Sequence, residues 1–339
     1  GDFRFTSNYH TKNNRYNILA HVIELDLINQ QNGGLTDESI LLFESNNSEF
    51  RDRGRLEVNF QDAENELKGF RVYGKQEFEL ITKKDSTDQN KLFIGNVMSF
   101  EDKSYVFKQD VPFDDYGESY KTSDLYKKGK LEDFNIQGYT RFENNHIGSL
   151  SAFIGYTNYN YGYNSLVILN NETITNRLKG DLITFTGSYE NKIGALDIKG
   201  NLGVNLSGNL DGNFVNGDVS YFLSDDIGVQ ASIYINSKTP DFNFQLNQSD
   251  YLSYNWQNSF KNQQTKQLAF AIDSKKLGTI EFDYNSIGNY LYFAKDLNAA
   301  VKPFQYGGTL NYARVKLSNE INYKRFALNN TVLFQSVLD

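Results

Sequence analysis

The sequence lacks cysteine altogether and contains only three histidines and three prolines. The absence of cysteine excludes disulfides, thiolate catalysis and cysteine-ligated zinc or iron–sulfur sites. The histidines, His10, His21 and His146, fall at predicted strand ends and in a turn, and no serine or carboxylate motif frames them. We therefore expect no enzyme activity, no metal site and no cofactor.

Long apolar runs are also missing. The longest, residues 40–43 and 166–169, are far shorter than the roughly 18 residues that a membrane-spanning helix needs. The net charge is -8, with 34 Lys+Arg against 42 Asp+Glu, so an extended cationic surface and a nucleic-acid partner are not expected. Both ends of the chain lie within strand-like alternation, and we expect the sequence to be truncated there.

Aromatic residues, in contrast, are abundant. The chain holds 26 Phe, 23 Tyr and 26 Gly, and aromatics make up 15% of it. A disordered chain would have few aromatics and many prolines. This composition is typical of β-structure with polar connections.

Apolar and polar side chains alternate over long stretches. In residues 196–206, Leu196, Ile198 and Leu202 share one parity, and Asp197 and Lys199 share the other. A helix would scatter these residues over its surface, so the period of two indicates a strand. Similar alternation occurs at 136–143, 215–223, 227–236 and 279–285. Over the whole sequence we expect about fourteen strands (12–16), each with one apolar and one polar face.

The strands are long, and their connections alternate in length. An eleven-residue strand is about 36 Å long and, when tilted, rises roughly as far as the ~25 Å apolar band of an outer-membrane barrel. Strands in soluble sandwiches are nearer about six residues. Short connections are expected at 143–147, 190–193, 224–226, 274–277 and 323–325, and longer ones at 158–179, 207–213, 236–266 and 286–305.

Short connections at one end of the strands and long ones at the other are typical of an outer-membrane barrel, which has short periplasmic turns and long extracellular loops. The predicted fold class is therefore all-β: a transmembrane antiparallel up-and-down β-barrel in a Gram-negative outer membrane, forming one domain over residues 1–339. The first third is less regular. There we expect strands near residues 3–9, 15–27, 56–60, 70–80 and 92–100, then a long charged loop.

The polar parity of the strands is predicted to face the lumen. Arginine or lysine turned toward lipid at mid-bilayer would cost about 2–4 kcal/mol, and mixed charges in a lumen would tune ion preference. A barrel of about fourteen strands is intermediate between small barrels, whose interior is filled by side chains, and large barrels with an open channel. A lumen filled by side chains and inward-folded loops is therefore an alternative. The predicted pore-lining residues are Arg141, Asp197, Lys199, Asp218, Gln230, Glu281 and Asp283.

Several segments carry a family resemblance. Residues 7–16 (SNYHTKNNRY) followed by 29–34 (NQQNGG), and residues 237–244 (SKTPDFNF) leading to 254–258 (YNWQN), resemble the porin family of Bacteroidota outer membranes. The resemblance covers essentially the whole chain. It implies an outer-membrane β-barrel and no particular substrate, and family members are generally longer and carry a signal peptide.

Other features have simpler readings. The acidic stretches 85–88 and 110–115 do not match an EF-hand loop, and solvated loop charge is favoured over divalent ions that bridge to lipopolysaccharide. The basic cluster 51–55 is read as the mixed-charge start of a strand rather than a headgroup site. Tyr156 is expected in the interfacial aromatic girdle. For Tyr159, Tyr161 and Tyr163, stacking on sugar rings and a place in the same girdle both stay open. For Trp256, loop packing and ligand contact both stay open.

The functional prediction is a channel for passive passage of small polar solutes or ions. The alternative is a non-conducting barrel that serves as a subunit or scaffold of a larger outer-membrane complex. A soluble β-sandwich adhesin is a third, weaker hypothesis. The expected partners are outer-membrane lipid and lipopolysaccharide, small polar solutes and other outer-membrane proteins.

Overall fold

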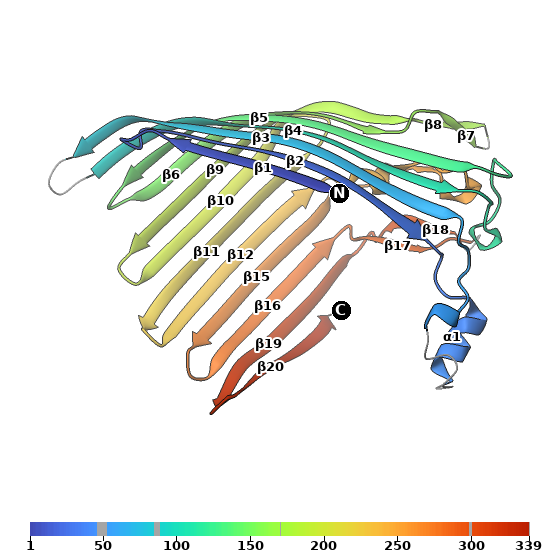
Figure 1. The fold of residues 1–339 in the computed structure, drawn as a ribbon. Coiled ribbons are helices and arrows are strands. Elements are labelled where there is room, and N and C mark those ends of the chain that lie inside the picture. Colours follow the sequence, from blue (N-terminus) through green and yellow to red (C-terminus); the bar gives the residue numbers. More distant parts are fainter. Residues whose placement is uncertain (46–52, 85–88, 170, 298–299, 339) are drawn as a thin grey trace.

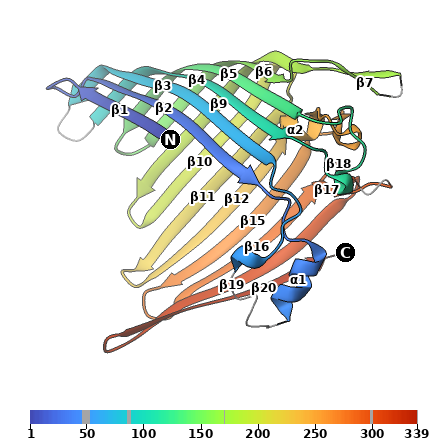
Figure 2. The same ribbon diagram turned by 45° about the vertical axis from the view of Figure 1, so that its right-hand side comes forward.

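The computed structural model describes residues 1–45, 53–84, 89–169, 171–297 and 300–338. Fourteen long strands form one antiparallel sheet in up-and-down order, which confirms the predicted fold class and strand number. The sheet curves into a deep trough (Figures 1 and 2). Its strands are β1 (Asp2–His10), β2 (Tyr16–Gln31), β3 (Ala63–Lys84), β4 (Gln89–Gln109), β5 (Leu125–Asn144), β6 (Gly148–Gly162), β9 (Arg177–Ile193), β10 (Leu196–Gly208), β11 (Gly212–Ser224), β12 (Ile227–Lys238), β15 (Gln263–Ser274), β16 (Gly278–Gly288), β19 (Thr309–Tyr323) and β20 (Phe326–Leu338).

Short turns and longer connections lie at opposite ends of the sheet, as predicted (Figure 1). Among the described strands, β1 and β20 form its two edges. The longer connections carry small elements of their own. These are helix α1 (Asp37–Glu44), a 3₁₀ helix at Arg53–Arg55, a 3₁₀ helix at Asp114–Tyr116, the hairpin β7 (Val167–Leu169) and β8 (Glu172–Ile174), helix α2 (Phe242–Gln245), the pair β13 (Leu246–Asn247) and β14 (Trp256–Gln257) with a 3₁₀ helix at Leu252–Tyr254 between them, and the hairpin β17 (Leu291–Lys295) and β18 (Val301–Gln305).

One face of the sheet is apolar and uncovered. Leu202, Val215 and Phe270 are each 47% exposed, although such side chains are normally buried in a soluble protein. Alternation places their polar neighbours on the other face. An exposed apolar band of this extent is the surface that a barrel presents to lipid. Among the described residues, no helix is long and apolar enough to span a membrane.

Three expected boundaries are wrong. The strand expected near 92–100 is 21 residues long and runs from Gln89 to Gln109, so the charged loop begins later. The connection expected at 207–213 is short, because β10 continues to Gly208 and β11 begins at Gly212. The connection expected at 158–179 begins only after Gly162. In β4 and β6 polar residues hid the alternation, since both faces of these strand ends carry asparagine, tyrosine or charge.

The expected strand at 56–60 is also wrong. Among its residues only Val58 bridges, to Leu35, and the Asn59 N–H donates to the Gly34 carbonyl (3.0 Å). The segment therefore pairs with its own loop and does not join the sheet. Helix α1 in the same loop was not predicted; it begins where Thr36 Oγ1 accepts a hydrogen bond from the Ser39 N–H (3.2 Å), a common N-cap arrangement.

Candidate functional site: the concave face and its mouth

All seven predicted pore-lining residues lie on one face of the sheet. Directly opposed residues of neighbouring strands share a face, so the register can be followed from strand to strand. Arg141 opposes Ser151, which opposes Ser188, which opposes Asn201 of β10. Asn201 has the parity of Lys199 and Asp197. The structure thus brings the seven residues onto one continuous surface.

Two rows of this surface cross six strands side by side. Each row contains acidic and basic residues separated by small or uncharged ones. One row reads Lys199, Asp218, Ser232, Ala269, Asp283 and Arg314. The other reads Asp197, Ser220, Gln230, Ala271, Glu281 and Lys316.

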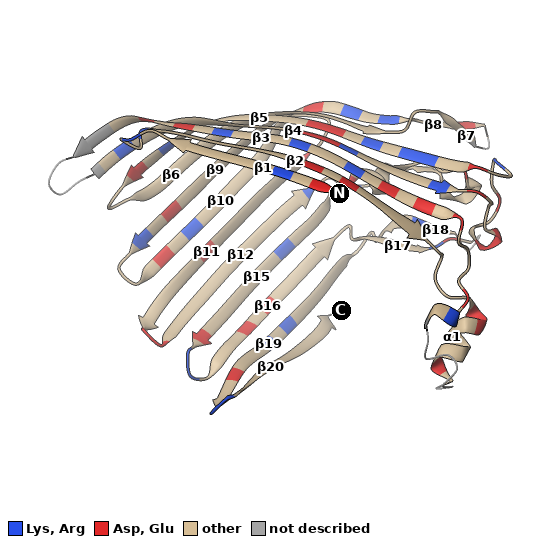
Figure 3. Ribbon diagram, viewed as in Figure 1, with Lys and Arg blue, Asp and Glu red and all other residues tan. Residues whose placement is uncertain are grey.

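Part of this charge is neutralised by pairing. Arg314 Nε lies 2.9 Å from Asp283 Oδ1, and Lys316 Nζ lies 3.2 Å from Glu281 Oε1. Arg141 bonds to Glu77 of β3 (2.6 Å) and to Glu143 (2.5 Å). Figure 3 shows charges of both signs on neighbouring strands.

Lys199 differs from these cations. It opposes Glu190 and Asp218 in the register, yet among the described residues it makes no ion pair within 4.0 Å. Lys75 and Lys192 have the same inner-face parity, and within the described part of the chain they likewise contact no carboxylate, so the ammonium groups of these lysines are not neutralised by a direct ion pair.

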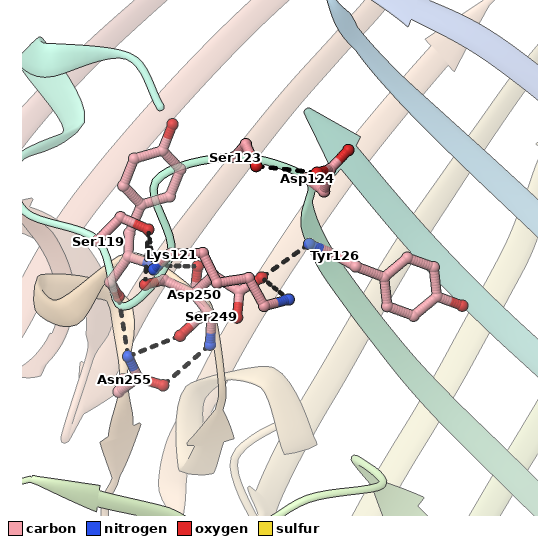
Figure 4. Close-up of polar contacts among 9 residues, drawn as sticks. Ser119, Lys121, Ser123, Asp124, Tyr126, Ser249, Asp250 and Asn255 are labelled. Atoms are coloured by element: carbon pink, nitrogen blue, oxygen red, sulfur yellow. Dashed lines mark hydrogen bonds and ion pairs between the residues drawn. The ribbon is translucent and has the colours of Figure 1, made fainter. Parts of the chain in front are cut away.

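One loop reaches across the mouth of the trough. Residues 239–262, named here the crossing segment, follow β12 and contact the β4–β5 loop; Figure 4 shows the polar contacts between the two. The Tyr120 N–H donates to the Asp250 carbonyl (2.8 Å), and Ser119 forms a bridge with Tyr251. The Asp250 carboxylate accepts from the Tyr126 N–H (2.7 Å).

The crossing segment is also fixed by buried polar side chains. Asn247 Oδ1 accepts from Lys127 Nζ (2.6 Å) and from the Tyr163 hydroxyl (3.1 Å). The Tyr251 hydroxyl donates to Gln109 Oε1 (2.6 Å) and accepts from the Phe113 N–H (2.9 Å). Because buried polar groups are costly unless hydrogen-bonded, this network specifies one docked position.

The Asn255 side chain holds the bend of the crossing segment itself. Its amide nitrogen donates to the carbonyls of Ser249 (3.0 Å) and Tyr251 (2.8 Å), and its oxygen accepts from the Ser249 N–H (2.9 Å). The side chain is 5% exposed. Burial raises the pKa of the Tyr251 phenol, which therefore remains a hydrogen-bond donor at neutral pH.

The crossing segment identifies the concave face. It docks on Lys127, Tyr161 and Tyr163, and Lys127 and Tyr161 have the parity of Arg141 across β5 and β6. A loop that joins two walls of a curved sheet runs on its inner side. The polar face with the predicted pore-lining residues is therefore the inner face, and an inward-folded loop is present.

Aromatic rings extend this packing. Phe242 of α2 stacks on Tyr159 and Tyr161, with ring centroids 5.2 and 5.3 Å apart. Tyr156 instead points to the outer face, where its hydroxyl bonds to Asp181. Trp256 donates from Nε1 to the Asn243 carbonyl (3.0 Å). Of the two alternatives left open for Trp256, the structure shows loop packing. Tyr159 and Tyr161 pack against α2 of the crossing segment, an arrangement that was not among the expectations for them.

The remaining sequence candidates form no site. Among the described residues, no group of three or more His, Asp or Glu could hold a metal ion. In the acidic stretch 110–115, the Val111 N–H donates to Asp62 Oδ2 (2.8 Å), which ties this loop to the start of β3. The stretch 85–88 and residues 51 and 52 of the basic cluster lie outside the described residues.

The residues that sequence reasoning missed are those of the mouth: Asn247, Asp250, Tyr251 and Asn255. Asn247, Asp250 and Tyr251 bond to residues far away in the chain; Asp250 and Lys121, for example, are 129 positions apart. Asn255 bonds within its own segment, to Ser249 and Tyr251. The only local signal is the concentration of Asn and Tyr in residues 243–258. That composition indicates a polar, aromatic loop but not where it docks.

The long antiparallel strands, the apolar outer face and the polar inner face define an outer-membrane β-barrel protein. The family described as "Putative porin" matches residues 1–339, and the chain belongs to that family. Among curated proteins, none matches the sequence.

Solved structures show the same fold. A mutant ferric enterobactin receptor from Pseudomonas aeruginosa is 11% identical, with a TM-score of 0.53, and the match covers 98% of this chain and 61% of the receptor. The FrpB iron transporter from Neisseria meningitidis is 9% identical, with a TM-score of 0.51, and the match covers 98% of this chain and 59% of the transporter. The chain thus spans about three fifths of these receptors' length. At this identity the likeness concerns the fold, and it supports location in the outer membrane.

Proposed function

We propose that the protein is a channel for passive passage of small polar solutes and ions across the outer membrane, with no catalytic activity. The observation that carries this proposal is the continuous inner face of hydroxyl, amide and charged side chains, including Arg141, Lys199 and Asp283. A polar lumen wall opposite a lipid-facing apolar wall is the arrangement of porins. The crossing segment serves as the constriction.

The test is single-channel conductance of the full-length, detergent-purified protein in a planar bilayer. Discrete, stable current steps are expected. Deletion of residues 242–258, with a short glycine linker in their place, should raise the step size because it removes the loop that spans the mouth. Verified insertion without current, in both the full-length protein and the deletion variant, would reject the channel.

A second candidate is a non-conducting subunit of a larger outer-membrane assembly. The observation that favours it is the dense attachment of the crossing segment at Asn247, Asp250 and Tyr251, which closes part of the mouth. Mild detergent extraction followed by size analysis separates the two candidates. Co-purification with other outer-membrane proteins, combined with a silent bilayer, would favour the subunit.

A further inference from the structure

A cavity of about 590 Å³ lies on the inner face, next to the first residue of the crossing segment, Thr239. Strands β5, β9, β10, β11 and β12 form its wall. Its volume falls in the range of about 300–1,000 Å³ that is usual for small-molecule sites. We name it the amide chamber, after the amides and hydroxyls of Asn135, Gln137, Thr184, Thr186, Asn205 and Asn216 that line it.

The amide chamber is almost free of charge. Among its described lining residues, the ionisable ones apart from Tyr234 are Asp211 and Lys238. Both stand at the loop end of the sheet, and Lys238 Nζ is paired with Asp241 Oδ1 at 2.7 Å. A second cavity of about 520 Å³ on the same sheet, by contrast, is lined by Asp273, Glu281, Asp283 and Arg314. The lumen wall therefore has a neutral zone and a charged zone.

Two aromatic rings stand among these amides. Phe214 lies over Gly203 so closely that a Cβ on Gly203 would come within 2.2 Å of the ring, so glycine is what lets the ring lie flat on the wall. Tyr234 is the next ring, and its hydroxyl accepts a hydrogen bond from the Asn236 amide (2.7 Å). Both rings are partly exposed. Each offers an apolar face beside hydrogen-bonding groups.

One acceptor in the amide chamber has no partner. The Asn216 side-chain oxygen is buried and accepts no hydrogen bond from any described residue. A buried polar atom normally has a partner, and a vacant one costs free energy. Rotation of the Asn216 side chain toward the chamber would bring this oxygen within reach of a hydroxyl group of a bound solute, which would supply the missing donor.

We propose that the amide chamber binds neutral, hydroxyl-rich solutes, that is, sugars. A sugar ring presents hydroxyls as donors and acceptors around its edge and C–H groups on its faces. Amides and hydroxyls match the edge, and the Phe214 and Tyr234 rings match the faces. A charged solute would have to lose water here without an opposite charge to pair with, which is unfavourable.

This inference rests on the proposed channel function, because it names the solute class that the channel would favour. It is tested by two independent measurements on the full-length protein in detergent or in a planar bilayer. Calorimetric titration with maltotriose measures binding, and the block of ion current by maltotriose measures occupancy of the lumen. Glutamate and inorganic phosphate are the charged comparison probes.

The variants are Phe214→Ala and Asn216→Leu, with Phe100→Ala as the matched control. Phe100 lies on the outer face of β4, since it opposes Phe134 of β5, whose parity is opposite to that of Arg141, and it is 37% exposed. Maltotriose should bind and block the wild-type protein, whereas glutamate and phosphate should not. Each chamber variant should weaken maltotriose binding by about tenfold and leave stable current steps, and the control should bind as the wild type does.

The outcomes separate the two proposals. Conduction without maltotriose binding, or binding that both chamber variants leave unchanged, would overturn the sugar site and leave the channel intact. Maltotriose binding that Phe214→Ala weakens, in a protein that does not conduct, would support the site and reject the channel. Tighter binding of glutamate or phosphate than of maltotriose would also overturn the inference.

Discussion

The Asp250 carboxylate lies 2.8 Å from Lys121 Nζ and also accepts the Tyr126 N–H (2.7 Å), so one side chain fastens the crossing segment both to the β4–β5 loop and to the start of β5. We expect Asp250→Ala to weaken this docking by about 1–2 kcal/mol, because hydrogen bonds to a charged group are worth about 1.5–3 kcal/mol when sheltered and less when exposed. Amide hydrogen exchange over residues 246–257 should accelerate by about 5–30-fold.

Asp241→Ala is the matched control for that prediction. Asp241 belongs to the same crossing segment, and it pairs with Lys238 at 2.7 Å, but both side chains are 64% exposed. Exposed pairs contribute little, so exchange over 246–257 should be unchanged. Equal acceleration in the two variants would show that Asp250 has no special role in docking.

We expect docking of the crossing segment to be sensitive to alkaline pH, because the Tyr251 phenol can lose its proton. Burial raises its pKa in the docked state, so docking is favoured below the ordinary value of about 10 and is lost as the pH rises through the raised value. Trp256, the only tryptophan, lies in the crossing segment and reports on it. Its emission should change above about pH 10 in the wild type.

Tyr251→Phe provides the control for this titration. It removes the hydroxyl that bonds Gln109 and Phe113, so the segment should be docked less firmly at neutral pH. The alkaline transition attributed to Tyr251 should disappear from the Trp256 emission. The assignment fails when the variant keeps the same transition, since other tyrosines would then cause it.

The faces of the sheet could be predicted from the sequence, whereas the mouth could not. Alternation in strands is a local property, so the shared face of Lys199, Asp218 and Asp283 follows from parity alone. The partners of those residues across the sheet also follow once the turns are placed. Docking of Asp250 on Tyr126 depends instead on the curvature of the whole sheet, which brings β12 and β5 within reach of one loop. No local pattern encodes that approach.

We expect the charge of Lys199 on the inner face to influence the ion selectivity of the channel. The change Lys199→Glu alters the local charge by two units at a residue without an ion-pair partner among the described residues. An interaction of about 1 kcal/mol per charge at 4 Å in water gives about 2 kcal/mol for a change of two charges, which corresponds to a cation preference raised by about thirtyfold. The reversal potential in a salt gradient measures this. Lys179→Glu, on the outer-face parity of β9, should leave selectivity unchanged, and an equal shift there would contradict the assignment of the faces.

We expect a measurable coupling free energy between Asp283 of β16 and Arg314 of β19. Arg314 Nε contacts both carboxylate oxygens (2.9 and 3.1 Å), and the Asp283 side chain is only 16% exposed. Arg314→Met should destabilise the protein more in the presence of Asp283 than in the Asp283→Asn background, with a coupling of about 0.5–3 kcal/mol. Urea unfolding in lipid vesicles measures the free energies of unfolding of the wild type, the two single variants and the double variant, which together form a double-mutant cycle. The pair Asp2–Arg4, at 3.6 Å with side chains 59% and 73% exposed, should couple by less than about 0.5 kcal/mol. Similar coupling in the two cycles would mean that the inner-face pair is solvated like an ordinary surface pair.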